Sequence, residues 1–405
     1  MITIHKDHLL IACKHLQRAV NARPTLPAIT CVHIEPGLHE TRFTSTNLEQ
    51  AVVASLPNSG SKLAALRAKN AGPFLVDAGV LANAAASADA GTFLQLDRDS
   101  IQLTIGGQVS TIPITMESAA EFPDLPVVDW MPVGGQIDLD ALKRLMRCAS
   151  TDEARYVLNG IYWDKEGLLI ATDGRRLHTE PFTPLDLDAG FNSVWDGVTI
   201  PSAACRMIPP RASISLERPK DKESPDEPVV HLPSRYIAFV ATENILTIRI
   251  FSKLVEGNYP NWRQVMAQPT SHSVRFNNQD AAANLRKINK LFAGRKNELR
   301  STMLEPSPGR ITFHLRKDDK ESPAIGSFTL PAVHTGDPQK ITFSTQFLID
   351  ALENGGDTFN YADGLCPARI TGVKQNTHVL MPMRTTPQPA ATTPEPEPEE
   401  EPCEA

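Results

Sequence analysis

The sequence lacks the long apolar segments of a membrane or secreted protein. It contains no run of 18 apolar residues, and Lys6, Asp7, Lys14 and Arg18 occupy the N-terminal stretch where a signal peptide needs apolar residues. We therefore expect a soluble, cytoplasmic protein that does not contact membranes.

Cysteines are few and scattered. No two form a CxxC pair and no histidine spacing complements them, so neither a zinc site nor a disulfide framework is indicated. We expect small buried side chains in a reducing compartment, except for the last cysteine, which lies near the C-terminus. The six are Cys13, Cys31, Cys148, Cys205, Cys366 and Cys403.

Catalytic motifs are missing as well. The sequence has no GxxxxGK[ST], GxGxxG, HExxH or GxSxG. His5 and His8 have no third ligand nearby, and Asp138 and Asp140 are explained by helix capping. Asp173, beside two arginines, is interpreted as a turn residue that accepts from backbone NH groups. We expect no catalytic residue, no metal and no cofactor.

The negative charge is confined to one end. The formal net charge is −7, and six glutamates lie in residues 385–405, so the remaining chain carries only about −1. This segment alternates Pro and Glu and has no large apolar residue, which predicts a disordered tail. A solubilising role and a specific binding role both fit it.

The body reads as three helix-then-sheet units. Their first helices are predicted at 7–21, 138–149 and 279–292, and second helices at 77–86, 201–208 and 344–352. Short strand-like segments bounded by Gly, Pro, Asn or Asp follow each. We expect an α+β protein with domains at 1–128, 129–268 and 269–384, each with helices on one face of antiparallel sheets.

Internal echoes support the repeat. Residues 44–49 (TSTNLE) resemble 170–175 (IATDGR), and 121–125 (EFPDL) resemble 258–262 (NYPNW). Polar insertions are predicted at 58–72, 209–233 and 305–322. The middle one is expected to be a mobile loop, although its basic residues also suit nucleic acid.

Each first helix combines an apolar face with a basic one. Leu9, Cys13, Leu16 and Val20 recur at helical spacing in the first, and Leu285 and Ile288 in the third. A single basic helix face is usually solvated, but three in equivalent positions suit phosphate contact without base reading. The basic residues are Lys14, Arg18, Lys143, Arg144, Arg147, Arg286, Lys287 and Lys290.

Residues 155–178 predict a two-strand hairpin. Strand-forming residues, Val157 among them, flank the turn at 164–167, and Asp173-Gly174 ends the second strand. Arg175, Arg176 and Leu177 are expected just beyond the sheet. Such a surface suits docking better than catalysis.

Four segments resemble the bacterial sliding clamp, the beta subunit of DNA polymerase III. They are RPTLP at 23–27, the hairpin with YVLNG and ATDGRRL, KLVEGNYPNWRQV at 253–265, and VLMPMR at 379–384. The resemblance implies a head-to-tail homodimeric ring with the clamp fold, each chain giving half the ring, around duplex DNA. It implies a non-catalytic processivity factor that recruits the polymerase III catalytic subunit, the clamp loader and other replication or repair proteins.

The resemblance also assigns residues. Arg23 and Tyr156 join the basic helix residues as DNA contacts. Ile112 and Ile114 are expected to meet Leu291 and Phe292 of the partner chain, because an apolar patch there would otherwise be exposed. The implied partner-peptide cleft comprises Leu158, Thr172, Gly174, Arg175, Arg176, Leu177, Pro260, Val265, Val379, Leu380, Met381, Pro382, Met383 and Arg384.

Some features depart from the family pattern, and two other functions fit the sequence. The tail begins at Thr385, beside the cleft, while Gln264 and His378 replace a basic and an aromatic residue. One alternative is a clamp-like scaffold that keeps the cleft but does not load on DNA. The other is a metal-dependent DNA-processing enzyme that uses Asp173.

Overall fold

The structure is a computed structural model, and the chain separates into two compact units. It describes residues 2–20, 26–58, 72–114, 118–133, 137–182, 197–218, 220–224, 227–232, 234–291, 300–317, 324–372 and 376–383. The units are Met1–Pro260 and Asn261–Ala405. Each has its own apolar core.

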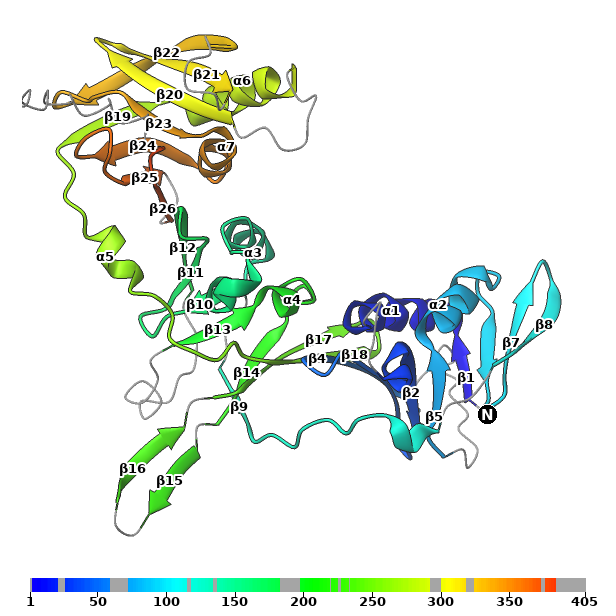
Figure 1. The fold of residues 1–405 in the computed structure, drawn as a ribbon. Coiled ribbons are helices and arrows are strands. Elements are labelled where there is room, and N and C mark those ends of the chain that lie inside the picture. The colour runs from blue at the N-terminus through cyan, green and yellow to red at the C-terminus, as the bar shows by residue number, and fades with distance from the viewer. Residues whose placement is uncertain are drawn as a thin grey trace, which may run out of the picture. The chain divides into compact units, whose positions relative to one another are not determined.

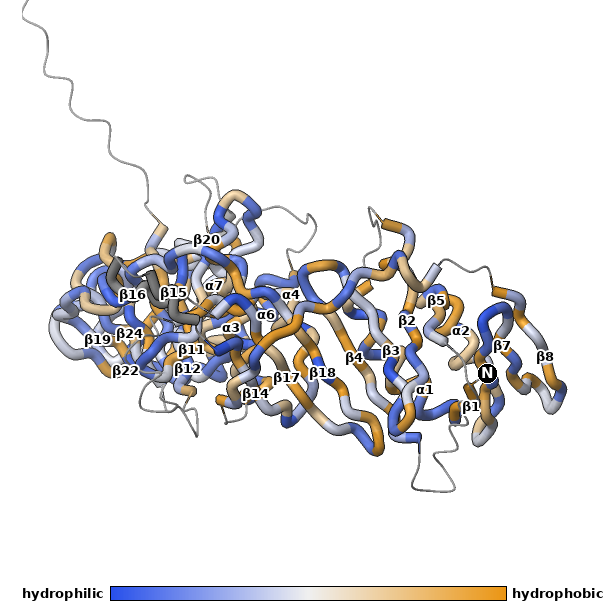
Figure 2. The backbone as a smooth tube through the Cα atoms, turned by 90° about the horizontal axis from the view of Figure 1, so that it is seen from below, coloured by the Kyte–Doolittle hydropathy of each residue, from blue (hydrophilic) through white to orange (hydrophobic). Residues whose placement is uncertain are grey.

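An eight-stranded antiparallel sheet organises the first unit (Figure 1). Its order is β5-β2-β3-β4-β18-β17-β14-β9. The bounds are β5 Phe74–Asp77, β2 Cys31–Pro36, β3 Glu40–Thr46, β4 Gln50–Pro57, β18 Leu246–Lys253, β17 Tyr236–Glu243, β14 Ser213–Glu217 and β9 Trp130–Pro132. Alternation of apolar and polar residues along β18 directs Ile248 and Ile250 into the core and can be followed in Figure 2.

Smaller sheets complete this unit. One has the order β1-β6-β7-β8, another β13-β10-β11-β12, and β15 pairs with β16. The bounds are β1 Ile2–His5, β6 Phe93–Leu96, β7 Ser100–Ile105, β8 Gln108–Pro113, β10 Gly160–Trp163, β11 Leu168–Thr172, β12 Arg176–Pro181, β13 Val198–Pro201, β15 Lys220–Ser224 and β16 Glu227–Leu232.

Helices cover the sheets of the first unit. They are α1 Lys6–Leu16, α2 Ala78–Ser87, α3 Leu139–Met146 and α4 Ser202–Cys205, with 3₁₀ turns at Gln17–Ala19, Pro27–Thr30, Ala119–Glu121 and Glu153–Leu158. Side chains of Asp77 and Asp138 cap α2 and α3 by accepting from Val80 N and Asp140 N, both at 2.9 Å. Helices α1 and α4 both pack against β18, which brings the first two predicted repeats together.

The second unit holds another antiparallel sheet, in the order β26-β25-β24-β19-β22-β21-β20-β23. The strands are β19 His272–Phe276, β20 Arg300–Ser307, β21 Arg310–Lys317, β22 Gly326–Thr335, β23 Ile341–Ser344, β24 Gly356–Tyr361, β25 Ala368–Gly372 and β26 Thr377–Leu380. The helices are α5 Trp262–Met266, α6 Asn278–Leu291 and α7 Thr345–Glu353, and α6 packs on α7. Leu285 and Phe276 lie in the core.

All six predicted helices are present and the antiparallel α+β class is confirmed. However, α1 ends at Leu16 and continues only as a 3₁₀ turn, and α4 covers only Ser202–Cys205 of the predicted 201–208. Two polar insertions are wrong. Residues 209–233 contain β14 and the β15–β16 pair, and 305–322 contain the end of β20 and all of β21, whose Ile311, Phe313 and Leu315 are buried. Most of the insertion predicted at 58–72 lies outside the described residues. The three-domain division stays a prediction.

The hairpin also differs from its prediction. Val157 lies in the 3₁₀ turn, not in a strand, and Arg176 and Leu177 lie within β12. Leu177 is buried and the Arg176 side chain is only 12% exposed, so Arg175 alone of this trio is displayed. Four cysteines are buried as expected, whereas Cys366 is half-buried.

Candidate nucleic-acid groove and partner-binding turn

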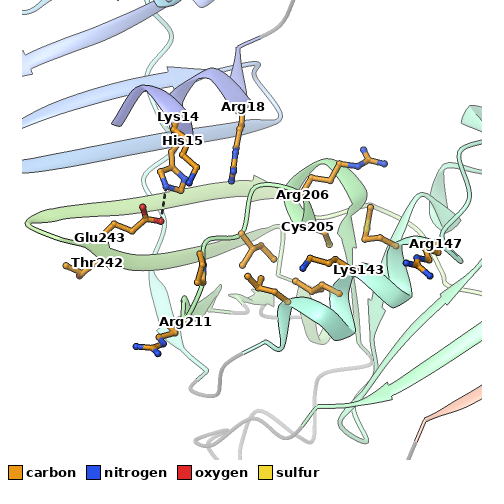
Figure 3. Close-up of a pocket in the computed structure, with 15 residues that line it drawn as sticks. Lys14, His15, Arg18, Lys143, Arg147, Cys205, Arg206, Arg211, Thr242 and Glu243 are labelled. Atoms are coloured by element: carbon orange, nitrogen blue, oxygen red, sulfur yellow. Dashed lines mark hydrogen bonds and ion pairs between the residues drawn. The ribbon is translucent and has the colours of Figure 1, made fainter. Parts of the chain in front are cut away.

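A basic groove lies between α1 and the α3–α4 pair (Figure 3). Its volume is about 1010 Å³, and Glu243 is the one carboxylate among the described residues lining it. The cations that line it are Lys14, Arg18, Lys143, Arg147, Arg206 and Arg211, all exposed.

Local structure explains why cations gather here. Lys14 lies in the last turn of α1, Lys143 in the last turn of α3, and Arg206 at the C-cap of α4. Cations at helix C-termini are favoured by the helix dipole, so each has a local structural reason. Their convergence on one groove from separate elements is not explained by helix stability.

A buried histidine and a glutamate form a hydrogen bond at one end of the groove. His15 is buried, and its Nε2 lies 3.0 Å from Oε1 of Glu243 in β17. Burial lowers the pKa of His15, although Glu243 acts against the shift. Arg18 donates from Nη1 to the carbonyl oxygen of Met207 at 3.2 Å. These contacts join α1 to the second predicted repeat.

The other predicted DNA contacts among the described residues do not line this groove. Arg144 is not on the exposed face: its side chain is 15% exposed and its Nε donates to Glu180 Oε1 at 2.5 Å. Tyr156 is 56% exposed. In the second unit, Arg286, Lys287 and Lys290 are exposed on α6, and Arg286 pairs with Glu353. Arg23 lies outside the described residues.

The turn between β11 and β12 is held by a compact set of hydrogen bonds. Thr172 Oγ1 donates to Arg176 O at 2.6 Å and accepts from Gly174 N at 3.1 Å. Asp173 Oδ1 accepts from the backbone NH groups of Arg175 and Arg176 at 2.9 and 3.0 Å. Asp173 therefore serves the turn, as the sequence suggested, and its other oxygen accepts from Arg176 Nε at 2.9 Å.

An aromatic stack lies behind this turn. The rings of Tyr162 and Tyr259 are 4.5 Å apart and nearly parallel, and burial raises the pKa of Tyr259 above its usual range. Leu158 is buried, and Pro260, which ends the unit, is exposed. Five of the predicted cleft residues of the first unit lie in this turn or at the strand ends that flank it, namely Thr172, Gly174, Arg175, Arg176 and Leu177.

The remaining cleft residues belong to the second unit. Val379 and Leu380 end β26 and are buried, whereas Met381 is 41% exposed and Pro382 and Met383 are half-buried. Met383 N donates to Thr342 O at 2.7 Å, which fixes the segment after β26. Val265 is half-buried in α5, and Arg384 lies outside the described residues.

Comparisons with the sequences and the structures of individual known proteins point to one group of proteins. No family model matches. The chain is 23% identical to the beta sliding clamp of Bacillus subtilis (strain 168), over 95% of the chain and 99% of that protein. It is 25% identical to that of Caulobacter vibrioides (strain NA1000 / CB15N), with the same coverage, and 26% identical to that of Synechocystis sp., over 91% and 95%.

Solved structures agree. The DNA polymerase sliding clamp from Bacillus subtilis aligns with a TM-score of 0.75 at 20% identity, over 95% of this chain and 99% of that one. A sliding clamp from Bartonella birtlesii bound to griselimycin aligns at 0.71 with 22% identity and the same coverage. The chain is a relative of the bacterial beta sliding clamps.

This clamp relative presents apolar residues near the predicted dimer contacts. β8 is an edge strand, and its Val109 is 74% exposed, while Ile112 and the following Ile114 are half-buried against the core. In the second unit Leu291 is 79% exposed at the end of α6. Phe292 lies outside the described residues.

Two groove residues of the clamp relative were missed by sequence reasoning. Arg206 follows α4, and Arg211 lies five residues later with a φ of +58°. A search for cations at the ends of all predicted helices would have found Arg206. Arg211 gave no such signal because its placement depends on the left-handed turn before β14.

Neither a metal-binding group nor a membrane-spanning helix is found among the described residues. No three His, Cys, Asp or Glu side chains gather there as a group that could hold a metal ion. No described helix is both long and apolar enough to cross a membrane.

Proposed function

We propose that the protein is a cytoplasmic, non-catalytic processivity factor for DNA replication. Two chains form a ring around duplex DNA, slide without sequence preference, and tether DNA polymerase III and other partners through a peptide-binding cleft. A clamp loader closes the ring on DNA. The single observation that supports this most strongly is the convergence of six cations on one groove in a relative of the sliding clamps.

The groove suits the phosphate backbone of DNA. Exposed lysines and arginines on rigid elements neutralise phosphates and release counterions, which gives salt-sensitive binding without base reading. The chemistry of the groove offers no catalytic constellation that would act on DNA. Arg144 is omitted from this proposal because Glu180 already engages its guanidinium group.

The partner cleft is proposed on two observations. The β11–β12 turn is rigid and displays Arg175, and the segment after β26 displays the soft side chain of Met381. Methionine and arginine beside apolar surface suit a short peptide with Leu or Phe anchors and polar ends. Exposed Met381 and Arg175 are better test positions than buried Leu177.

The deciding experiment loads the protein on nicked circular DNA with its cognate loader and then linearises the DNA. Topological binding predicts retention on the circle and release after cutting. A scaffold that does not load leaves the circle unbound, and direct site binding persists on the linear product. Either result contradicts the proposal.

The groove itself can be tested by salt titration. Lys14→Gln and Lys143→Gln each remove one cation from the groove. Each variant is expected to weaken DNA binding and to reduce the slope of log affinity against log salt by about 0.9 per lost phosphate contact. Arg218→Gln, an exposed cation outside the groove, is the matched control. An unchanged slope in the groove variants would exclude these residues as phosphate contacts.

A further inference from the structure

The first predicted repeat contains a second copy of the β11–β12 turn. Between β3 and β4, Thr46 Oγ1 donates to Gln50 O at 2.8 Å and accepts from Leu48 N at 3.0 Å. Asn47 Oδ1 accepts from the NH groups of Glu49 and Gln50 at 3.0 and 2.7 Å. These four bonds repeat, in order, the bonds made by Thr172 and Asp173.

The aromatic support is duplicated too. Phe122 precedes Pro123 as Tyr259 precedes Pro260, and it stacks on His33 with ring centres 5.1 Å apart and planes 15° apart. The Tyr259 ring stacks likewise on Tyr162. The copy therefore includes both the turn and the segment that lies beside it.

One residue of the copy is unexpected for a purely structural turn. Leu48 has a φ of +77°, and Gly174 at the equivalent position has +84°. Left-handed backbone favours glycine, and Leu48 gains no burial in exchange, because its side chain is 45% exposed. A turn selected only for its shape is satisfied by glycine, so the exposed leucine calls for another explanation.

Cavities adjoin this turn on the same unit. One of about 80 Å³ is lined by the turn, by Pro123–Pro126, and by Tyr236, Phe251 and Lys253. A larger one of about 930 Å³ shares Pro123, Asp124, Leu125 and Phe251 with it. Trp130 lines the larger cavity with its ring centre 5.6 Å from that of Phe251. Their apolar lining includes Leu125 and Phe251 and, in the larger cavity, Phe122 and Trp130.

The charge at the turn is reversed relative to its counterpart. Where the β11–β12 turn has Arg175, the copy has Glu49, and around the small cavity Asp124 adds a second carboxylate against the one lysine, Lys253. The larger cavity is also lined by Glu35, Arg42 and Arg249, none of which lines the small cavity beside the turn. Glu49, Asp124 and Lys253 are all exposed. A ligand that docks beside the turn, next to Glu49 and Asp124, therefore needs positive charge beside its apolar anchor.

We propose that the β3–β4 turn and the two cavities form a second peptide-docking site, for a short linear segment that carries a leucine or aromatic anchor and an adjacent basic residue. The anchor contacts Leu48 and Phe251, and the basic residue pairs with Glu49 or Asp124. The site stands on the geometry of the first unit and does not depend on DNA loading.

Two probes test it by fluorescence anisotropy: a labelled heptapeptide with one leucine, one phenylalanine and two arginines, and a matched peptide with glutamates in place of the arginines. The basic peptide is expected to bind the full-length protein more tightly. Leu48→Asp is expected to weaken it at least tenfold, and the double variant Glu49→Lys/Asp124→Lys to reverse the preference. Aspartate tolerates a positive φ better than leucine, so the fold is kept.

The matched control is Arg175→Glu in the other turn. It is expected to leave binding of the basic peptide unchanged and to weaken any binding of the acidic one. Equal affinity for both peptides, no binding of the basic peptide, no effect of Leu48→Asp, or loss of the basic peptide in Arg175→Glu would each overturn the proposal. Failure of the ring on nicked circles, by contrast, leaves this result unaffected.

Discussion

Glu180 joins a helix to a strand in the second predicted repeat through a buried charged cluster. Its side chain is 6% exposed, and Oε1 lies 2.5 Å from Arg144 Nε and 2.7 Å from His178 Nε2. Arg144 comes from α3 and Glu180 from β12, so the cluster ties helix to sheet. A buried carboxylate with two partners is costly to disrupt because the remaining charge stays buried.

We therefore expect Glu180→Gln to reduce the free energy of unfolding by about 3 kcal/mol at pH 7. The amide keeps the size of the side chain but removes its charge and one acceptor. Urea denaturation followed by circular dichroism measures the change. Asp140→Asn, at the exposed pair with Lys143, serves as the control and is expected to have no measurable effect. Equal effects of the two substitutions would contradict the prediction.

The same residue sets a pH dependence. Burial acts to raise the pKa of Glu180, but hydrogen bonds from His178 and Arg144 outweigh it and lower the pKa to about 2. The folded pKa lies below the unfolded one, so this stability is complete above about pH 4.5 and is lost as the pH falls toward 2. Stability curves of the wild type and Glu180→Gln should converge over that range. Parallel curves would assign the effect to another group.

Arg144 also shows where sequence reasoning stops at this scale. In α3, Leu142 and Leu145 are buried, whereas Lys143 and Arg147 lie on the exposed face expected for the basic residues. Arg144 lies at the border of the two faces, and its burial depends on a carboxylate 36 residues away. Spacing predicts which face a residue occupies, but it contains no information about distant charge partners.

At the scale of elements, the segment from 209 to 233 shows most clearly where prediction from composition fails. Its density of charge and proline predicts a loop. However, Ile214 and Leu216 pair with β17 and are buried, and Leu216 also pairs with β9. Strands β15 and β16 form a hairpin that pairs only with itself among the described strands. Whether a short alternating segment within polar sequence forms a strand depends on its pairing with distant strands. Composition contains no information about that pairing.

The hairpin should be dispensable for folding. Ser234 Oγ donates to Glu217 O at 2.7 Å and Arg235 N donates to Glu217 Oε2 at 2.8 Å, so the chain ends are already close at its base. Replacing 219–233 with a Gly-Ser-Gly linker is expected to change the melting temperature by only about 2 °C. Differential scanning calorimetry measures this.

The control for replacing 219–233 with the linker is the variant Ser234→Ala, in which the hairpin is intact. It removes the buried hydroxyl that joins the two ends, and we expect it to destabilise the protein by about 1 kcal/mol. A deletion that melts far below Ser234→Ala would show that the hairpin contributes to the core.

At the scale of the whole molecule, the proposed dimer leads to a separate prediction. Leu291 is 79% exposed in the single chain, so an aspartate there costs little in folding but opposes an apolar interface. Leu291→Asp is expected to weaken dimerisation at least tenfold in analytical ultracentrifugation while keeping the unfolding midpoint of the monomer.

Leu365→Asp provides the matched control in the same unit. Leu365 is 66% exposed but was not expected at the interface. Dimers in both variants, or monomers in both, would remove Leu291 from the proposed contact. The sequence patterns, from MPMR to the basic helices, indicate a ring but not which exposed leucine lies at its interface.

The eight-stranded sheet has a consequence for how the first unit comes apart. Six consecutive residue pairs join β4 to β18, from Gln50–Ser252 to Ser55–Thr247. The peptide link between the first and second repeats, at 123–129, is therefore not what holds them together. A protease that nicks it would leave two fragments bound as one particle, and any hinge that lets a ring open has to lie elsewhere than at this seam.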